Sequence, residues 1–144
     1  MTEAAKAFEE YIKKENITGF QVREPGDERQ TTVFESEVEI EGRRLPIIVI
    51  IDATAYATIR IRLAQNAVDD TNAMLLTGWL MRQNQDSRLV KFYLTSDTTI
   101  IADAVVPHNP DRFDPDVMVS VLRVFIRDIT ALMPELAQLL PETE

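Results

Sequence analysis

The segment TTVFESEVEIEGRRLPIIVIIDATAYATIRIRL, residues 31–63, decides the fold of this 144-residue chain. In its first part, glutamates at positions 35, 37 and 39 alternate with apolar or small residues. Because successive side chains of a strand point to opposite faces of the sheet, this period of two predicts a strand with one buried and one solvated face. Residues 45–51 are apolar at every position, and residues 57–63 alternate again. The segment therefore predicts three consecutive antiparallel strands.

The turn between the first two strands sets their expected register. Glycine adopts positive φ readily, so we expect Gly42-Arg43 to form a two-residue hairpin loop that places Ile40 opposite Leu45. A five-residue loop over 52–56 then keeps the third strand in step. In this register, one face of the sheet carries an apolar stripe between an acidic and a basic rail. We define the apolar stripe as Pro46, Ile48 and Ile50, the acidic rail as Glu35, Glu37 and Glu39, and the basic rail as Arg60 and Arg62.

Periodic apolar residues predict three helices, over residues 2–15, 68–85 and 115–133. Asp114 is the expected N-cap of the last helix, Pro115 its first residue and Pro134 its end. Shorter strands are predicted over 20–24, 89–95 and 98–106. The order helix, four-strand meander, helix, hairpin, helix predicts an α+β fold, with an antiparallel sheet that has helices packed on one face.

The chain is strongly acidic, with 24 acidic residues against 15 basic residues, a net charge of −9 and a pI near 4.6. Phosphate backbones and anionic membranes repel such a domain, so we expect neither nucleic acid nor a membrane as partner. The absence of cysteine excludes disulfides, thiol nucleophiles and cysteine-based metal sites. We expect no signal peptide, one cytoplasmic domain over residues 1–140, and a disordered tail over 141–144.

The stretch from Leu75 to Ile129 contains a helix ending in LMRQN, the strand VKFYL, a polar turn, the strand IIADAVVP and a further helix. This pattern resembles the YbjN family, whose fold is similar to that of the type III secretion chaperones. The element order agrees over nearly the whole chain, as do the small size and the acidic character. The secretion chaperones are homodimers that hold partly unfolded client segments and have no catalytic residues. YbjN-like proteins are often called regulators and have no defined chemistry, so the resemblance implies no particular site residue.

Few residues of the chain suggest catalysis. The single histidine, His108, lies near Asp111, Asp114 and Asp116, which suggests either a metal site or simply capping and charge at a helix N-terminus. The four glycines are too dispersed for a phosphate-binding loop, and no serine lies in a G-x-S-x-G motif. We therefore expect no enzyme, cofactor or metal. The alternative is a small enzyme or ligand-binding protein with a pocket between sheet and helices.

Arginines are concentrated in two places, at positions 43, 44, 60 and 62 near one end of the meander and at positions 123 and 127 on the last helix. Such clusters suggest a basic patch that holds phosphate or an acidic peptide. The alternative is pairing with carboxylates across strands or along the helix. The overall negative charge favours pairing.

Two apolar surfaces remain once the core is assigned. The apolar stripe either meets a partner or lies under another element. The middle helix has a second apolar face, at Met74, Thr77, Gly78 and Met81, beside the face formed by Leu75, Leu76 and Trp79. This second face packs either against another copy or inside one subunit. We expect a non-enzymatic protein-binding module, chaperone-like or regulatory. It would present the stripe and the basic rail to a protein or peptide client and form a homodimer through the middle helix.

Overall fold

A computed structural model describes residues 1–142 of the chain. Within that range, three α-helices and six strands are found, and the strands form one antiparallel sheet in the order β1-β2-β3-β4-β6-β5. The helices are α1 (Glu3–Lys14), α2 (Ala73–Asp86) and α3 (Pro115–Leu139), with a 3-10 turn at Pro110–Arg112. The strands are β1 (Gln21–Arg23), β2 (Thr32–Ile40), β3 (Arg43–Ile51), β4 (Tyr56–Ala64), β5 (Val90–Leu94) and β6 (Ile100–Pro107). The predicted α+β class and element order are confirmed, while residues 143–144 of the predicted tail lie outside the described residues.

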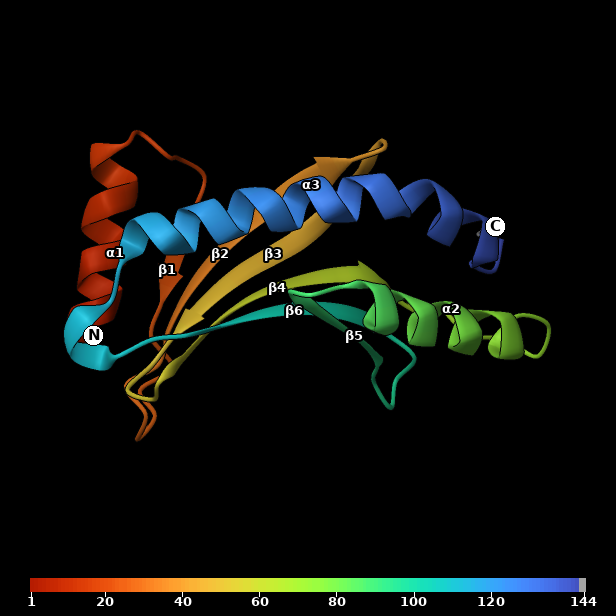
Figure 1. Ribbon diagram of the computed structural model, residues 1–144, viewed down its shortest axis with the longest axis horizontal. Helices are drawn as coiled ribbons and strands as arrows, with labels where there is room; N and C mark the ends of the chain where they lie inside the picture. The colour runs from red at the N-terminus through yellow and green to blue at the C-terminus, as the bar shows by residue number, and fades with distance from the viewer. Residues whose placement is uncertain (143–144) are drawn as a thin grey trace.

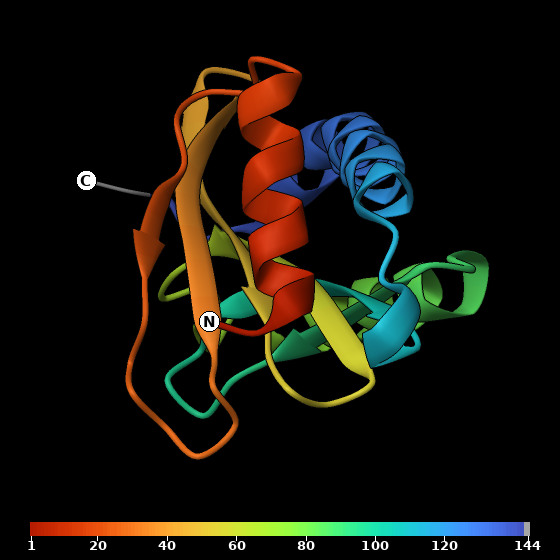
Figure 2. The same cartoon turned by 90° about the vertical axis from the view of Figure 1, so that its left-hand side faces the viewer.

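The terminal helices α1 and α3 cover one face of the sheet (Figures 1 and 2). They contact each other, and α3 crosses in front of the strands. Figure 2 shows both helices on the same side of β2 and β3, with no helix on the other side. α2 lies apart from α3 and packs against the edge strand β5. The sheet therefore has an inner face under α1 and α3 and an outer face without a helix.

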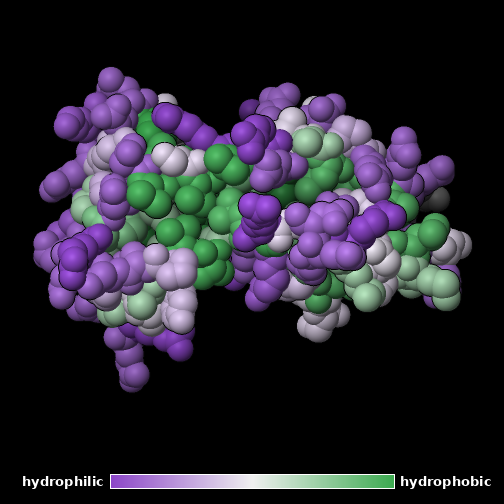
Figure 3. Space-filling model, in the orientation of Figure 1, coloured by the Kyte–Doolittle hydropathy of each residue, from purple (hydrophilic) through white to green (hydrophobic). Residues whose placement is uncertain are grey.

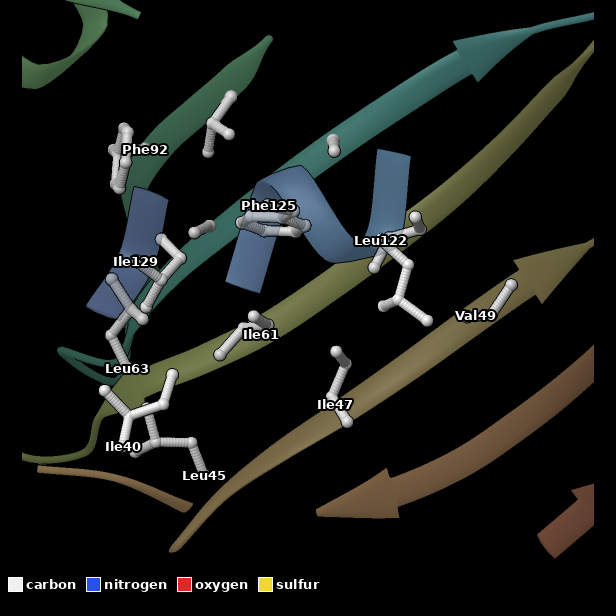
Figure 4. Close-up of a cluster of buried hydrophobic side chains, with 14 of the residues drawn as sticks. Ile40, Leu45, Ile47, Val49, Ile61, Leu63, Phe92, Leu122, Phe125 and Ile129 are labelled. Atoms are coloured by element: carbon white, nitrogen blue, oxygen red, sulfur yellow. The ribbon is translucent and has the colours of Figure 1, made fainter. Parts of the chain in front are cut away.

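The core fills the space between the inner face and α3 (Figure 4). From α3, Leu122, Phe125 and Ile129 point towards the sheet, and all three are buried. The inner positions of β6 include Ala102 and Ala104, both fully buried, and their small side chains let the helix approach the sheet closely. Each large apolar side chain buried in this way stabilises the fold by about 1.5–3 kcal/mol. The strand side chains in this cluster include Ile40, Leu45, Ile47, Val49, Ile61, Leu63 and Phe92.

The β2–β3 hairpin turns at Glu41-Gly42, so the predicted loop at Gly42-Arg43 is wrong. Glu41 and Gly42 have φ of 52° and 76°, and a type I′ turn requires positive φ at both central residues. Ile40 is consequently paired with Arg43 and not with Leu45. The shift is even in length, so every side chain keeps the face that the alternation predicts. The turn therefore lies one residue earlier than predicted, but the predicted face of each side chain is unchanged.

α2 begins at Ala73, five residues later than predicted. The preceding residues form a turn in which Asp69 Oδ1 accepts hydrogen bonds from the backbone N–H groups of Thr71 and Asn72, at 2.9 Å and 3.0 Å. The Asn72 side chain also donates to the carbonyl of Leu139, at 2.9 Å. Asp and Asn side chains compete with helical hydrogen bonds in this way, which delays the start of the helix.

α3 begins as predicted but does not end at Pro134. Asp114 is its N-cap, with Oδ1 accepting a 3.0 Å hydrogen bond from the backbone N–H of Asp116. The helix continues through Pro134 to Leu139. A proline inside a helix costs about 3 kcal/mol. Met133 and Leu136, on either side of it, are almost completely buried, and their burial offsets that cost.

Candidate partner-binding surfaces

The outer face carries the predicted apolar stripe on its third strand, β3. Pro46, Ile48 and Ile50 are half-buried, and their neighbours in the strand, among them Ile47 and Val49, are buried on the inner face. No helix covers the outer face of β2 and β3 (Figure 2). The stripe is therefore partly accessible to solvent, and no helix of residues 1–142 covers it.

The two rails lie on the strands next to the stripe. Glu35 of the acidic rail is opposite Ile48, and on the other side Ile48 is opposite Arg60 of the basic rail. Glu37 is opposite Pro46, and Arg62 follows Ile61 on β4 with its side chain exposed. The rows through Ile48 and Pro46 thus read acid, apolar, base, whereas Ile50 lies between Val33 and Thr58.

Arg60 is not a free cation, because it is paired with Asp103 on β6. Its Nε and Nη2 donate to Asp103 Oδ1 and Oδ2, at 2.8 Å and 3.1 Å, which makes the pair bidentate. Asp103 is only 5% exposed, although it lies on the outer face. The hydrogen bonds and charge of Asp103 raise the pKa of Arg60, against an opposing effect of burial. The prediction that arginines pair with carboxylates holds here, and at Arg44, which lies 3.7 Å from Glu37.

Tyr93 of β5 completes the polar cluster around Asp103. Its hydroxyl donates to Asp103 Oδ2 at 2.9 Å, and Lys91 Nζ lies 5.0 Å from the centre of the Tyr93 ring. Burial, followed by this hydrogen bond, raises the pKa of Tyr93. The sequence contained no signal for this cluster, because its partners are brought together by the sheet from positions far apart in the chain.

A shallow hollow of about 650 Å³ opens beside the stripe. It extends from Gly19 and Gln21 over the acidic rail to Pro46 and Ile48. Apolar side chains here lie next to carboxylates that are accessible from solvent. A surface of this kind combines an apolar anchor point with a charged rim, which is the usual composition of a protein interface.

The edge of β5 that pairs with no other strand is hydrogen-bonded to the side chain of Asn84. Asn84 of α2 donates from Nδ2 to the carbonyl of Phe92 at 2.8 Å and accepts from the Phe92 N–H at 2.7 Å. The carboxamide therefore occupies the two backbone groups that an added strand would need at this position. Of the two edge strands, only the three-residue β1 keeps its edge without such a contact among the described residues.

The exposed side of α2 forms a second apolar surface. Met74 is 89% exposed and Met81 68%, and Thr77 and Gly78 between them are also exposed. Leu75 is 66% exposed, so the prediction that it packs with Leu76 and Trp79 is wrong. Figure 3 shows hydrophobic residues at the end of the molecule where α2 lies. The helix is not enclosed within one subunit on this side.

A groove of about 700 Å³ separates α2 from α3 above β5. Its floor includes Val90 and Phe92 of β5, and Val124 contributes from α3. One ion pair spans it, with Arg82 Nη2 3.2 Å from Glu135 Oε1. The apolar surface near Val124, which is 37% exposed, was not predicted from the sequence.

His108 and the aspartates that follow it contact nearby side chains and backbone groups. The ring packs edge-on against Phe113, with centroids 5.1 Å apart, and neither ring nitrogen has a hydrogen-bond partner among the described residues. Asp114 caps α3, and Asp116 accepts a 2.7 Å hydrogen bond from the Tyr11 hydroxyl. Over residues 1–142, no three His, Asp or Glu side chains lie close enough together to hold a metal ion.

No helix in the described part of the chain combines the length and the apolar character needed to cross a membrane. Comparisons with protein-family models, curated proteins and solved structures found no match to this chain. The resemblance to the YbjN family therefore stays a prediction.

Proposed function

We propose that this protein is a non-enzymatic protein-binding module, chaperone-like or regulatory, whose binding site is the outer face of the sheet. The observation that carries the proposal is the apolar stripe at Pro46, Ile48 and Ile50, which no helix covers. Soluble domains usually bury contiguous apolar residues, and a stripe that stays partly accessible beside a charged rim is typical of an interaction site. In the proposed complex the aliphatic side chains anchor the partner, and Arg60 and Arg62 orient it.

The state of the carboxylates supports binding over catalysis. Asp103 is the most buried carboxylate of the described residues, and a desolvated carboxylate in a pocket would favour the alternative, a small enzyme or ligand-binding protein. Asp103, however, lines neither the hollow beside the stripe nor the groove between α2 and α3, and it is fully engaged by Arg60 and Tyr93. Its contacts give it a structural role in the outer face.

We also propose that the chain forms a homodimer through α2. The exposed methionines Met74 and Met81 lie on either side of Gly78, and a Cβ at Gly78 would meet nothing within 4 Å. Glycine in an exposed helix costs roughly 0.5–1 kcal/mol relative to alanine, and no contact within the subunit offsets this cost. Close approach of a second helix at Gly78 would offset it.

Affinity capture with matched variants tests the outer face as the binding site. The wild type and the double variant Ile48→Asp, Ile50→Asp serve as baits, followed by mass spectrometry of the bound proteins. The control bait, Met74→Asp, Met81→Asp, carries the same new charges on α2. We expect the stripe variant to lose proteins that both other baits retain. Circular dichroism confirms that each bait is folded, and recovery of the same proteins by all three would refute the proposal.

Sedimentation velocity tests the α2 dimer. Met74→Asp, Met81→Asp is expected to weaken self-association, because the contact would have to bury four new carboxylates per dimer. A wild type that sediments as a monomer at about 100 μM, a concentration at which weak dimers with millimolar Kd are partly formed, would remove this proposal.

A further inference from the structure

The charges of the outer face are arranged in rows across the strands. One row contains Gln21, Glu35, Ile48, Arg60 and Asp103, which are consecutive partners from β1 to β6. Centred on Ile48, an acid lies one strand to one side and a base lies one strand to the other side. Within one copy, Glu35 is paired with Arg23 at 2.9 Å and Arg60 with Asp103 at 2.8 Å, so a second copy would add to these pairs. The row through Glu37, Pro46 and Arg62 repeats the same order.

Two copies can stack outer face to outer face about a two-fold axis that lies between them and runs parallel to β3. In this stack, the charge pattern of one copy is complementary to that of the other. Such a rotation exchanges the two edges of β3 and leaves each residue at the same position along the strand direction. β2 of one copy then lies over β4 of the other, so Glu35 faces the other copy's Arg60 and Glu37 faces its Arg62. Ile48 packs on Ile48. An axis perpendicular to the strands would instead place β2 over β2, with glutamate against glutamate.

The outer face also carries little net charge, so two copies repel each other only weakly there. The whole chain has a net charge of −9. The outer positions of the strands carry five cations and four carboxylates, so the local charge is close to neutral. They are Arg23, Arg44, Arg60, Arg62 and Lys91, and Glu35, Glu37, Glu39 and Asp103.

We propose that the partner for which the outer face is built is a second copy of this chain, stacked sheet on sheet about a two-fold axis along β3. This inference rests on the proposed function, because it names the partner of the same site. Facing sheets pack about 10 Å apart, a gap that a glutamate and an arginine reaching from opposite sides can span.

The test uses charge exchange at Glu37 and Arg62, which are both exposed and are not members of the Arg60–Asp103 pair. All variants are made in the full chain that carries Met74→Asp, Met81→Asp, so that contacts through α2 do not contribute. Sedimentation velocity over a concentration series compares four samples. They are this background protein, the background protein with E37R, the background protein with R62E, and an equimolar mixture of the last two.

We expect the background protein to dimerise, and each single variant to bind itself at least about tenfold more weakly, because its two-fold contact brings like charges together twice. The mixture restores the affinity. In the mixed pair the new arginine at position 37 meets the new glutamate at position 62, and the other contact keeps its natural charges. A background protein that stays monomeric, or a mixture no tighter than the single variants, overturns the inference.

Different results would contradict the outer face as a binding site and the second copy as its partner. If the background protein is a monomer while Ile48→Asp, Ile50→Asp loses captured proteins, the outer face binds a different partner and only the second-copy inference is wrong. If the stripe variant retains every captured protein and self-association is also unchanged, both are wrong.

Discussion

Arg60 and Asp103 lie opposite each other on β4 and β6 and form a bidentate ion pair on the open face of the sheet. Asp103 is nearly inaccessible, whereas the Arg60 side chain remains 38% exposed. The arginine thus covers a carboxylate that would otherwise lose its hydration without compensation. The pair gives the outer face a rigid polar cluster beside the apolar stripe.

Replacement of Arg60 should destabilise the fold more than replacement of its exposed neighbour. Arg60→Met leaves the Asp103 carboxylate buried without its main partner, and we expect a loss of about 1–3 kcal/mol in the free energy of unfolding, less than for a fully buried pair because Arg60 is partly solvated. Urea unfolding followed by circular dichroism measures it. The control Arg62→Met should stay within about 0.5 kcal/mol. Equal effects of the two variants would contradict this role of the pair.

Removal of the Asn84 carboxamide should open the edge of β5. Asn84→Ala removes two hydrogen bonds to Phe92, so we expect a loss of about 1–3 kcal/mol and a greater tendency to aggregate through the exposed strand. Unfolding curves and light scattering over time report the two effects. Gln85→Ala, at the next and equally exposed position of α2, is the control. If both variants behaved alike, Asn84 would not protect the edge.

Asp69 should make stability depend on pH in the acid range. Hydrogen bonds from the Thr71 hydroxyl and backbone, and from the Asn72 backbone, lower its pKa below the ordinary value of 3.8. The folded state therefore binds this proton less readily than the unfolded state. The stabilisation is present above about pH 4 and is lost as the pH falls through the folded pKa.

NMR titration of the Asp69 carboxyl group measures this pKa. Thr71→Val removes the hydroxyl donor and should raise the pKa towards 3.8, with a smaller loss of stability on acidification. An unchanged pKa in this variant would show that the hydroxyl is not its main cause.

Gly78→Ala should separate the stability of the subunit from its association. The new methyl group has free space in one subunit, so we expect the helix to gain roughly 0.5–1 kcal/mol. The same methyl group should weaken the proposed α2 dimer if two backbones approach at this point. Unfolding of the dilute protein should therefore show a gain in stability, whereas sedimentation of the concentrated protein should show weaker self-association. A gain in both would place Gly78 outside any helix contact.

The alternation of residues in β2 and β4 was sufficient to predict which side chains lie on the outer face. The same reasoning placed the turn one residue too late, because it put Gly42 first in the loop, whereas Glu41 and Gly42 are the two residues that adopt positive φ. It also failed where tertiary contacts override local preference. Burial of Met133 and Leu136 carries α3 through Pro134.

Features that depend on long-range pairing were not predictable from local pattern. Arg60 and Asp103 are 43 residues apart in sequence, and only the strand order brings them together. Asn84 has the sequence context of an ordinary exposed helix residue, and nothing there indicates its contact with Phe92. The exposure of Leu75 was missed because α2 packs against β5 at the edge and not between two layers.

The Glu41-Gly42 turn joins two strands whose pairing decides which side chains are buried. If β3 slipped along β2 by two residues, every side chain would keep its face. A slip of one residue would bring Pro46, Ile48 and Ile50 under α3 and turn the buried Ile47 and Val49 outward. A residue inserted at this turn is therefore expected to lengthen the loop and to leave the strands in their present register.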